Sequence, residues 1–111
     1  MDLTADLRGN TLVIHANEDR VDAASAIQFK DRMRELTQTP SVSVVLDLSQ
    51  VAFVDSSGLG AIVAVLKALA PDRKLELAGL TPTVKKVFRL TRMEQVFTIH
   101  DELPLNLHHA S

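Results

Sequence analysis

The chain of 111 residues contains no cysteine, tryptophan or tyrosine, and only four glycines and four prolines. Without cysteine it can form neither a disulfide nor a thiolate metal site, which fits a reducing compartment. Apart from histidine, phenylalanine is the only aromatic residue, so no platform for stacking bases or sugars is expected. We expect all four phenylalanines in the core: Phe29, Phe53, Phe88 and Phe97.

Charge of one sign and long apolar runs are also lacking. Lys and Arg number 12 against 14 Asp and Glu, so no basic patch favours a nucleic-acid partner. Apolar stretches such as Leu59 to Leu66 fall well short of the roughly 20 residues of a membrane span, and no leader pattern precedes them. We expect a soluble cytoplasmic protein without membrane insertion. It should form a single domain over residues 1–111, with a core at about 3–103 and a polar tail.

Signals for catalysis, cofactors and metals are missing as well. No histidine has metal-ligand spacing, and no glycine-rich nucleotide-binding fingerprint occurs. A serine hydrolase of the G-x-S-x-G type is not supported, because Val54 stands two residues before Ser56 where glycine would be needed. We therefore expect no enzyme, no cofactor and no metal site. The four histidines are His15, His100, His108 and His109.

Apolar periodicity in the first third of the chain predicts a hairpin followed by a helix. Residues 3–7 and 12–16 alternate in polarity around a Gly9-Asn10 turn, as paired strands do. Asp22 has the residue type of an N-cap, so we expect a helix from Ala23 to about Leu36. Its core stripe would comprise Ala23, Ala26, Phe29, Met33 and Leu36.

The rest of the chain alternates strands with helices. The apolar run from 42 to 48 predicts a central parallel strand. A helix at about 57–70, a strand at 74–78, a helix opened by Thr81-Pro82 and a strand at 96–99 should follow. This order predicts an α/β fold with a mixed, mostly parallel sheet, an N-terminal hairpin and helices packed in a right-handed β-α succession. The basic face of the last helix, whether solvated or a dock for an acidic partner, comprises Lys85, Lys86, Arg89 and Arg92.

The turn from Asp55 to Gly60 joins an apolar run to the long helix and is the candidate functional site. A hydroxyl there lies beside free N–H groups of the first helical turn, so Ser56 is well placed to carry a phosphoryl group. Alternatively, Ser56 or Ser57 simply caps the helix. Gly58 and Gly60 each cost roughly 1 kcal/mol relative to alanine inside a helix. Either close packing on the sheet or close approach of a partner would account for them.

The stretch Val51 to Gly60 resembles the signature of anti-sigma factor antagonists, the single STAS-domain proteins of bacterial partner switching. Arg20 to Ala26 resembles that family's loop before its first helix. Gly79 to Val84, with Phe88, resembles the opening of its third helix. The resemblance spans roughly residues 3 to 103 and implies the STAS fold.

The resemblance also implies a mechanism and a set of site residues. In that family an anti-sigma factor, itself an ATP-dependent serine kinase, phosphorylates the serine after the aspartate, which is Ser56 here. The unmodified protein binds the anti-sigma factor and frees the sigma factor; phosphorylation ends binding and a PP2C-type phosphatase resets the switch. ATP is carried by the partner. The implied partner-binding residues are Asp22, Asp55, Ser56, Ser57, Gly58 and Leu59.

Two departures from the family pattern and one alternative accompany this hypothesis. Asp19 stands where the family commonly has glycine, which adds charge near the proposed contact surface, and Arg92-Met93 replaces a Gly-Leu pair in a turn. The alternative is a non-switching STAS subunit that acts as a scaffold in a stress-signalling or membrane transport assembly. Because no apolar stripe is left over once the core is assigned, we expect a monomer outside complexes.

Overall fold

A five-stranded mixed sheet forms the centre of the computed structural model, which describes residues 1–103. Its strand order is β1-β2-β4-β6-β7, with β1 antiparallel to β2 and the other pairs parallel. This confirms the predicted α/β fold, its N-terminal hairpin and its central strand. The strands are β1 Leu3–Arg8, β2 Thr11–Ala16, β4 Ser43–Asp47, β6 Lys74–Ala78 and β7 Ile99–His100.

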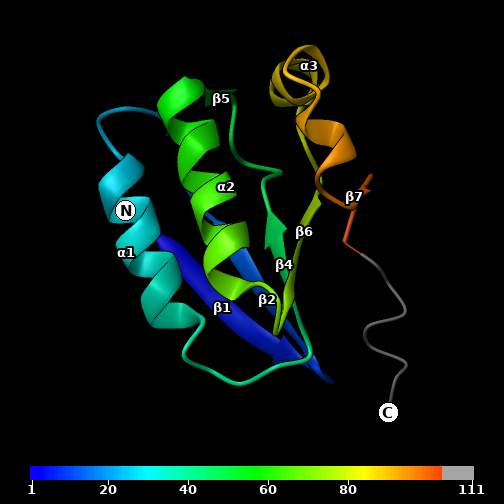
Figure 1. Cartoon of the computed structure of the whole chain (residues 1–111). Helices are drawn as coiled ribbons and strands as arrows, with labels where there is room; N and C mark the ends of the chain where they lie inside the picture. The colour runs from blue at the N-terminus through cyan, green and yellow to red at the C-terminus, as the bar shows by residue number, and fades with distance from the viewer. Residues whose placement is uncertain (104–111) are drawn as a thin grey trace.

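Three helices connect the parallel strands (Figure 1). Helices α1 (Ala26–Leu36) and α2 (Ser56–Leu69) lie side by side on one face of the sheet, and α3 (Pro82–Leu90) follows β6. A buried stripe of α2 packs on apolar side chains of the sheet because its core residues recur every three or four positions. The largest fully buried side chains include Phe29, Phe88, Ile14, Met33, Leu46 and Ile62.

A second, two-stranded sheet was not predicted. Strands β3 (Arg20–Val21) and β5 (Phe53–Val54) are parallel, with Arg20 opposite Phe53 and Val21 opposite Val54. The carbonyl of Asp19 extends the pairing, since it accepts hydrogen bonds from the backbone N–H groups of Ala52 at 2.6 Å and Phe53 at 3.2 Å. Two-residue strands leave too little alternation for sequence reasoning to detect. Their pairing brings the loop before α1 against the turn before α2.

The prediction that Asp22 caps the first helix was wrong. Ser25 is the N-cap and α1 begins at Ala26, which leaves Ala23 exposed and outside the helix. Asp22 instead organises the preceding turn: its Oδ1 accepts hydrogen bonds from the Ala24 N–H and the Ser25 hydroxyl. The remaining stripe is confirmed, with Phe29 and Met33 fully buried.

The last strand was also placed too early. Residues 93–95 form a 3₁₀ turn, and β7 begins only at Ile99. Phe97, in the expected strand, is buried and packs edge-on against Phe88 with ring centroids 5.8 Å apart. Arg92, before the 3₁₀ turn, has a φ of 61°, the left-handed conformation that glycine adopts most easily. His108 and His109 lie outside the described residues.

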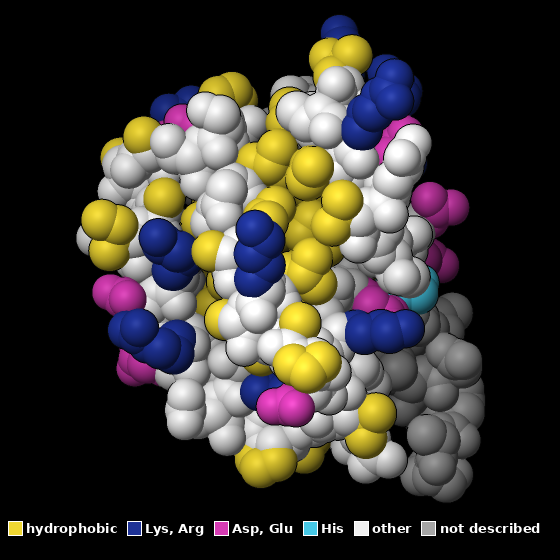
Figure 2. All heavy atoms as spheres, viewed as in Figure 1, with side chains coloured by type: hydrophobic (Ala, Val, Ile, Leu, Met, Phe, Trp, Pro, Cys, Tyr) yellow, Lys and Arg dark blue, Asp and Glu magenta, His cyan; other side chains and the backbone are white. Residues whose placement is uncertain are grey.

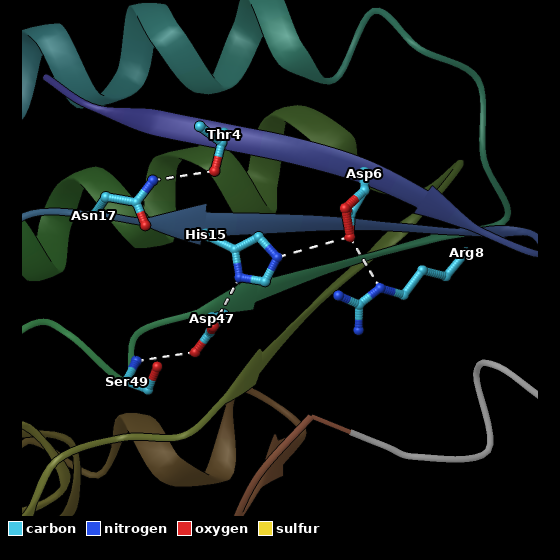
Figure 3. Close-up of polar contacts among 7 residues, drawn as sticks. All are labelled: Thr4, Asp6, Arg8, His15, Asn17, Asp47 and Ser49. Atoms are coloured by element: carbon cyan, nitrogen blue, oxygen red, sulfur yellow. Dashed lines mark hydrogen bonds and ion pairs between the residues drawn. The ribbon is translucent and has the colours of Figure 1, made fainter.

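The sheet face opposite α1 and α2 carries a polar cluster that links β1, β2 and β4 (Figure 3). His15 Nδ1 lies 2.8 Å from an oxygen of Asp47, its register partner, and His15 Nε2 lies 3.8 Å from Asp6. Asp6 also accepts a hydrogen bond from Arg8. Partial burial alone would raise the pKa of Asp47. The His15 hydrogen bond and the Ser49 N–H outweigh this, so the pKa of Asp47 is lowered overall.

Asp47→Asn should make the free energy of unfolding less dependent on pH in the acid range. A carboxylate with a lowered folded-state pKa stabilises the fold above its unfolded pKa of about 3.9, and this stabilisation is lost as pH falls through the folded value. The native chain should therefore lose more unfolding free energy between about pH 5 and 2 than the variant does, as measured by urea titration. Asp72→Asn, at an exposed carboxylate, is the control. Equal pH dependence in the native chain and Asp47→Asn would contradict the assignment.

Close packing of α2 against β3 accounts for one of the two glycines near its start. A Cβ placed on Gly58 would lie 1.9 Å from the Val21 carbonyl oxygen and 2.6 Å from its carbon, far inside van der Waals contact. Both atoms belong to the backbone, so no side-chain rotation could relieve the clash. Gly58 therefore allows the start of α2 to lie directly against the backbone of β3, at the loop before α1.

Gly58→Ala should destabilise the fold by about 2 kcal/mol or more, because the backbone of α2 or β3 would have to move. Gly60→Ala, two residues further along the same helix, is the matched control, since an added Cβ there meets nothing within 4 Å. Urea unfolding of both variants measures the difference. Equal stability of the two variants would show that the contact with Val21 is not a constraint.

Candidate functional site

The candidate site lies where β5 passes into α2, next to the loop before α1. Ser56 is the first residue of α2, and both Ser56 and Ser57 are exposed. Neither serine side chain makes a hydrogen bond to another residue within the described range 1–103. The hydroxyl of Ser56 is thus accessible and uncommitted.

Asp55, and neither serine, caps α2. It has extended backbone angles, its Oδ1 accepts the Gly58 N–H at 2.8 Å, and its carbonyl accepts the Leu59 N–H. The alternative that Ser56 or Ser57 caps the helix was therefore wrong, and phosphorylation of Ser56 stays a prediction. Because Asp55 satisfies the helix terminus, the serines are not needed for it.

The same carboxylate ties the two loops together. Oδ2 of Asp55 accepts a hydrogen bond of 3.0 Å from the backbone N–H of Ala23, which lies in the turn before α1. The hydrogen bond from Gly58 has the largest effect and holds the pKa of Asp55 below its usual range; desolvation opposes it, and the weaker hydrogen bond from Ala23 adds to the lowering. Asp55 is thus an anion at neutral pH, directly before Ser56.

Asp22 lies in the loop that Asp55 holds. Its carboxylate is mostly covered, with 15% of the side chain exposed, and it lies 3.8 Å from the guanidinium of Arg20. Because the Ala23 N–H bonds to Asp55, the residue after Asp22 contacts the residue before Ser56. The structure thus brings Asp22, Asp55, Ser56 and Ser57 to one end of the fold, as the family resemblance implied, and their part in binding stays a prediction.

Gly58 and Leu59 belong to the same turn but are buried. Gly58 contacts the backbone of Val21, and Leu59 joins the apolar core. In this conformation their packing positions the exposed residues of the turn. A direct role for either residue in partner binding stays a prediction.

Phe53 and Arg20 were not among the predicted site residues. The expectation that all four phenylalanines are core was wrong for Phe53, which is 39% exposed and lies under the Arg20 guanidinium at 5.3 Å from the ring centroid. The two side chains border a shallow hollow beside the site. No sequence signal identified Phe53, because β5 is too short to show alternation; in the structure Phe53 faces outward and its neighbour Val54 faces inward. The hollow is completed by Glu18, Asp19 and Ala52.

Other kinds of site receive no support from the residues that the structure describes. Between Met1 and Leu103 no group of three or more acidic, histidine or cysteine side chains is arranged to hold a metal ion. Each helix among these residues is too short or too polar to span a lipid bilayer. His15 and His100 pair with carboxylates of the sheet and lie apart from Ser56 in the fold.

Comparison with known proteins gives anti-sigma factor antagonists and, in fold alone, anion transporters such as murine Slc26a9, with a TM-score of 0.69, 16% identity, and coverage of 78% of this chain and 14% of the transporter. The chain is 28% identical over 80 residues to the anti-sigma-B factor antagonist of Listeria monocytogenes, an alignment that covers 71% of this chain and 70% of the relative. Its fold is similar to that of an anti-sigma-factor antagonist (STAS) domain protein from Planctomyces limnophilus, with a TM-score of 0.84, 19% identity, and coverage of 99% and 97% of the two chains.

The phosphorylated form of SpoIIAA, a cell fate determinant of Bacillus, is also similar in fold. The TM-score is 0.57 at 22% identity, and the match covers 88% of this chain and 90% of SpoIIAA. The sequence model of the STAS domain matches residues 2–106, nearly the full length of the chain. Together with the sheet order and the capped turn at Ser56, this match shows that the chain belongs to the STAS domain family.

Proposed function

We propose that this chain is an anti-sigma factor antagonist whose binding to an anti-sigma factor is controlled by phosphorylation of Ser56. The unphosphorylated chain binds the anti-sigma factor, a serine kinase that carries the ATP, and so releases the sigma factor. Phosphorylation ends binding, and a PP2C-type phosphatase restores it. The chain itself acts as a cytoplasmic regulator of transcription and catalyses no reaction.

The observation that carries this proposal is an uncommitted, exposed Ser56 hydroxyl at a helix start that Asp55 already caps. A kinase substrate needs an accessible hydroxyl whose modification breaks no hydrogen bond that stabilises the fold. A serine that capped α2 would lose about 1 kcal/mol of helix stabilisation if its oxygen were modified. The arrangement at Ser56 avoids that conflict.

Electrostatics supports the release step. A phosphoserine adds about −1.5 to −2 charge at pH 7. It would arise beside the Asp55 carboxylate and near Asp22, while the N-terminus of α2 offsets part of the repulsion, typically by 0.3–1 kcal/mol. The fold should therefore survive. A partner that had enclosed the neutral serine would instead meet an unpaired charge in a desolvated interface.

Relatives support both parts of the proposal. The curated relative is an anti-sigma-B factor antagonist, and SpoIIAA, similar in fold, exists in a phosphorylated form. The non-switching scaffold makes a different prediction, because its association with a larger assembly would not depend on the charge at Ser56. Substitutions at Ser56 therefore separate the two functions.

Ser56→Ala should bind the anti-sigma factor and stay bound in the presence of ATP, because no phosphoryl acceptor remains. The anti-sigma factor is obtained as the host protein kinase that copurifies with this variant. Ser56→Asp should bind at least about tenfold more weakly than the native chain, since it buries an unpaired charge. Titration calorimetry measures both affinities, and intact-mass analysis after incubation with ATP measures the phosphoryl group.

Ser57→Ala is the matched control, since Ser57 is equally exposed and directly adjacent. It should still be phosphorylated once, on Ser56, and ATP should release it from the anti-sigma factor, whatever the affinity of the unmodified variant. A phosphoryl group on Ser57, or release of Ser56→Ala by ATP, would disprove the assignment of Ser56. Stable recovery of a large assembly with native chain and Ser56→Asp alike would support the scaffold instead.

A further inference from the structure

Gly60 has no structural explanation within the chain. It is exposed in the second turn of α2, its φ lies outside the left-handed region, and a Cβ built on it meets nothing within 4 Å. Glycine inside a helix costs roughly as much as a lost hydrogen bond relative to alanine. Gly58, by contrast, is required by its contact with Val21. The missing side chain at position 60 therefore leaves space for something outside this chain.

Helical geometry places Gly60 directly below Ser56. Residues four apart lie one above the other on a helix surface. Lys67 follows Gly60 by about two helical turns and lies on the same line. The core-facing residues of α2 lie on the opposite side: Gly58, Ala61, Ile62, Val65 and Leu69. The outermost ridge of α2 thus runs from the phosphorylatable serine through a position without a side chain to a lysine.

Apolar side chains border this ridge on its α3 side. Val63 and Leu66 are only partly buried, and Figure 2 shows hydrophobic side chains gathered beside α2 in the direction of α3. On α3, Val87 is partly buried and Leu90 is 70% exposed. Val87 and Leu90 lie on the side of α3 away from Lys85. Lys85 pairs with Asp101, next to β7. This unassigned apolar surface departs from the expectation that no such stripe remains.

We propose that the anti-sigma factor docks along this ridge, with a segment of its backbone against Gly60 and an apolar side chain between α2 and α3. This deepens the proposed function and rests on it. The ridge is continuous with Ser56, so one partner would cover both. Charge indicates the chemistry of the segment: Lys67 on α2 and Lys86 on the exposed face of α3 flank the apolar surface, so carboxylates should flank the partner's apolar side chain.

The inference assigns Gly60 as a contact residue, which makes stability and binding respond in opposite directions. Gly60→Ala should raise the melting temperature by about 4 °C, because alanine is the better helix former. Gly60→Gln should keep the fold but weaken binding at least about tenfold, since its side chain would occupy the space of the partner backbone. A residue needed for folding would show the reverse, a fall in melting temperature.

Ala68→Gln is the matched control. Ala68 is exposed on the same helix but lines the surface towards α1 with Lys30 and Arg34, away from α3. The probe is the copurified anti-sigma factor kinase described above, titrated into each variant. Binding by Ala68→Gln should match the native chain. Native-like binding by Gly60→Gln, or destabilisation by Gly60→Ala, would overturn the docking ridge.

Failure of the ridge and failure of the switch remain distinguishable. If Gly60→Gln binds normally while Ser56→Asp does not, the phosphorylation switch stands and the docking ridge is wrong. If Gly60→Gln and Ser56→Asp both bind like the native chain, both proposals fail.

Because the chain has no cysteine, Val63→Cys and Ala68→Cys each carry a unique thiol for a photocrosslinker. Crosslinking to the kinase at position 63 and not at 68 would support the ridge, and the converse would overturn it.

Discussion

The Asp55 carboxylate is the interaction on which the site depends. One oxygen caps α2 through Gly58, and the other holds the backbone of Ala23 in the loop before α1. Two loops that are more than 30 residues apart in sequence are thereby fixed to each other by one side chain. Both hydrogen bonds favour the ionised form, which is why the pKa of Asp55 is lowered. The cap of the helix therefore does not depend on the Ser56 side chain that follows.

Most of the fold could be predicted because its signals are long and periodic. The hairpin, the central strand, α2, β6 and the start of α3 each rest on several apolar residues at the spacing of a strand or a helix. Thr81 was correctly placed as the N-cap position of α3, although its hydroxyl bonds to the carbonyl of Val51 instead of to the helix. In the turn at Ser56, residue type and order alone were sufficient to predict the passage from a strand into a helix, whereas its functional role stays a prediction.

The errors fall where tertiary contacts outweigh local pattern. Asp22 looked like a helix cap, but its carboxylate closes a separate turn and Ser25 takes the capping position. Phe53 looked like a core residue, but β5 is so short that the core receives only Val54. The β3 and β5 pair left no detectable signal in the sequence, because two residues cannot show alternation. Its role in joining the two loops is visible only in three dimensions.

Asp19 shows how the backbone and the surface of this site can change independently. Its carbonyl accepts two hydrogen bonds and so fixes the first loop to β5, whereas its side chain is exposed beside the site. Any residue supplies the same carbonyl, so the geometry around Ser56 places little restriction on the side chain at position 19. Duplicated copies of such a chain within one genome could diverge in charge here while keeping the same fold and the same turn. Insulation between parallel signalling routes could thus arise from a single exposed position.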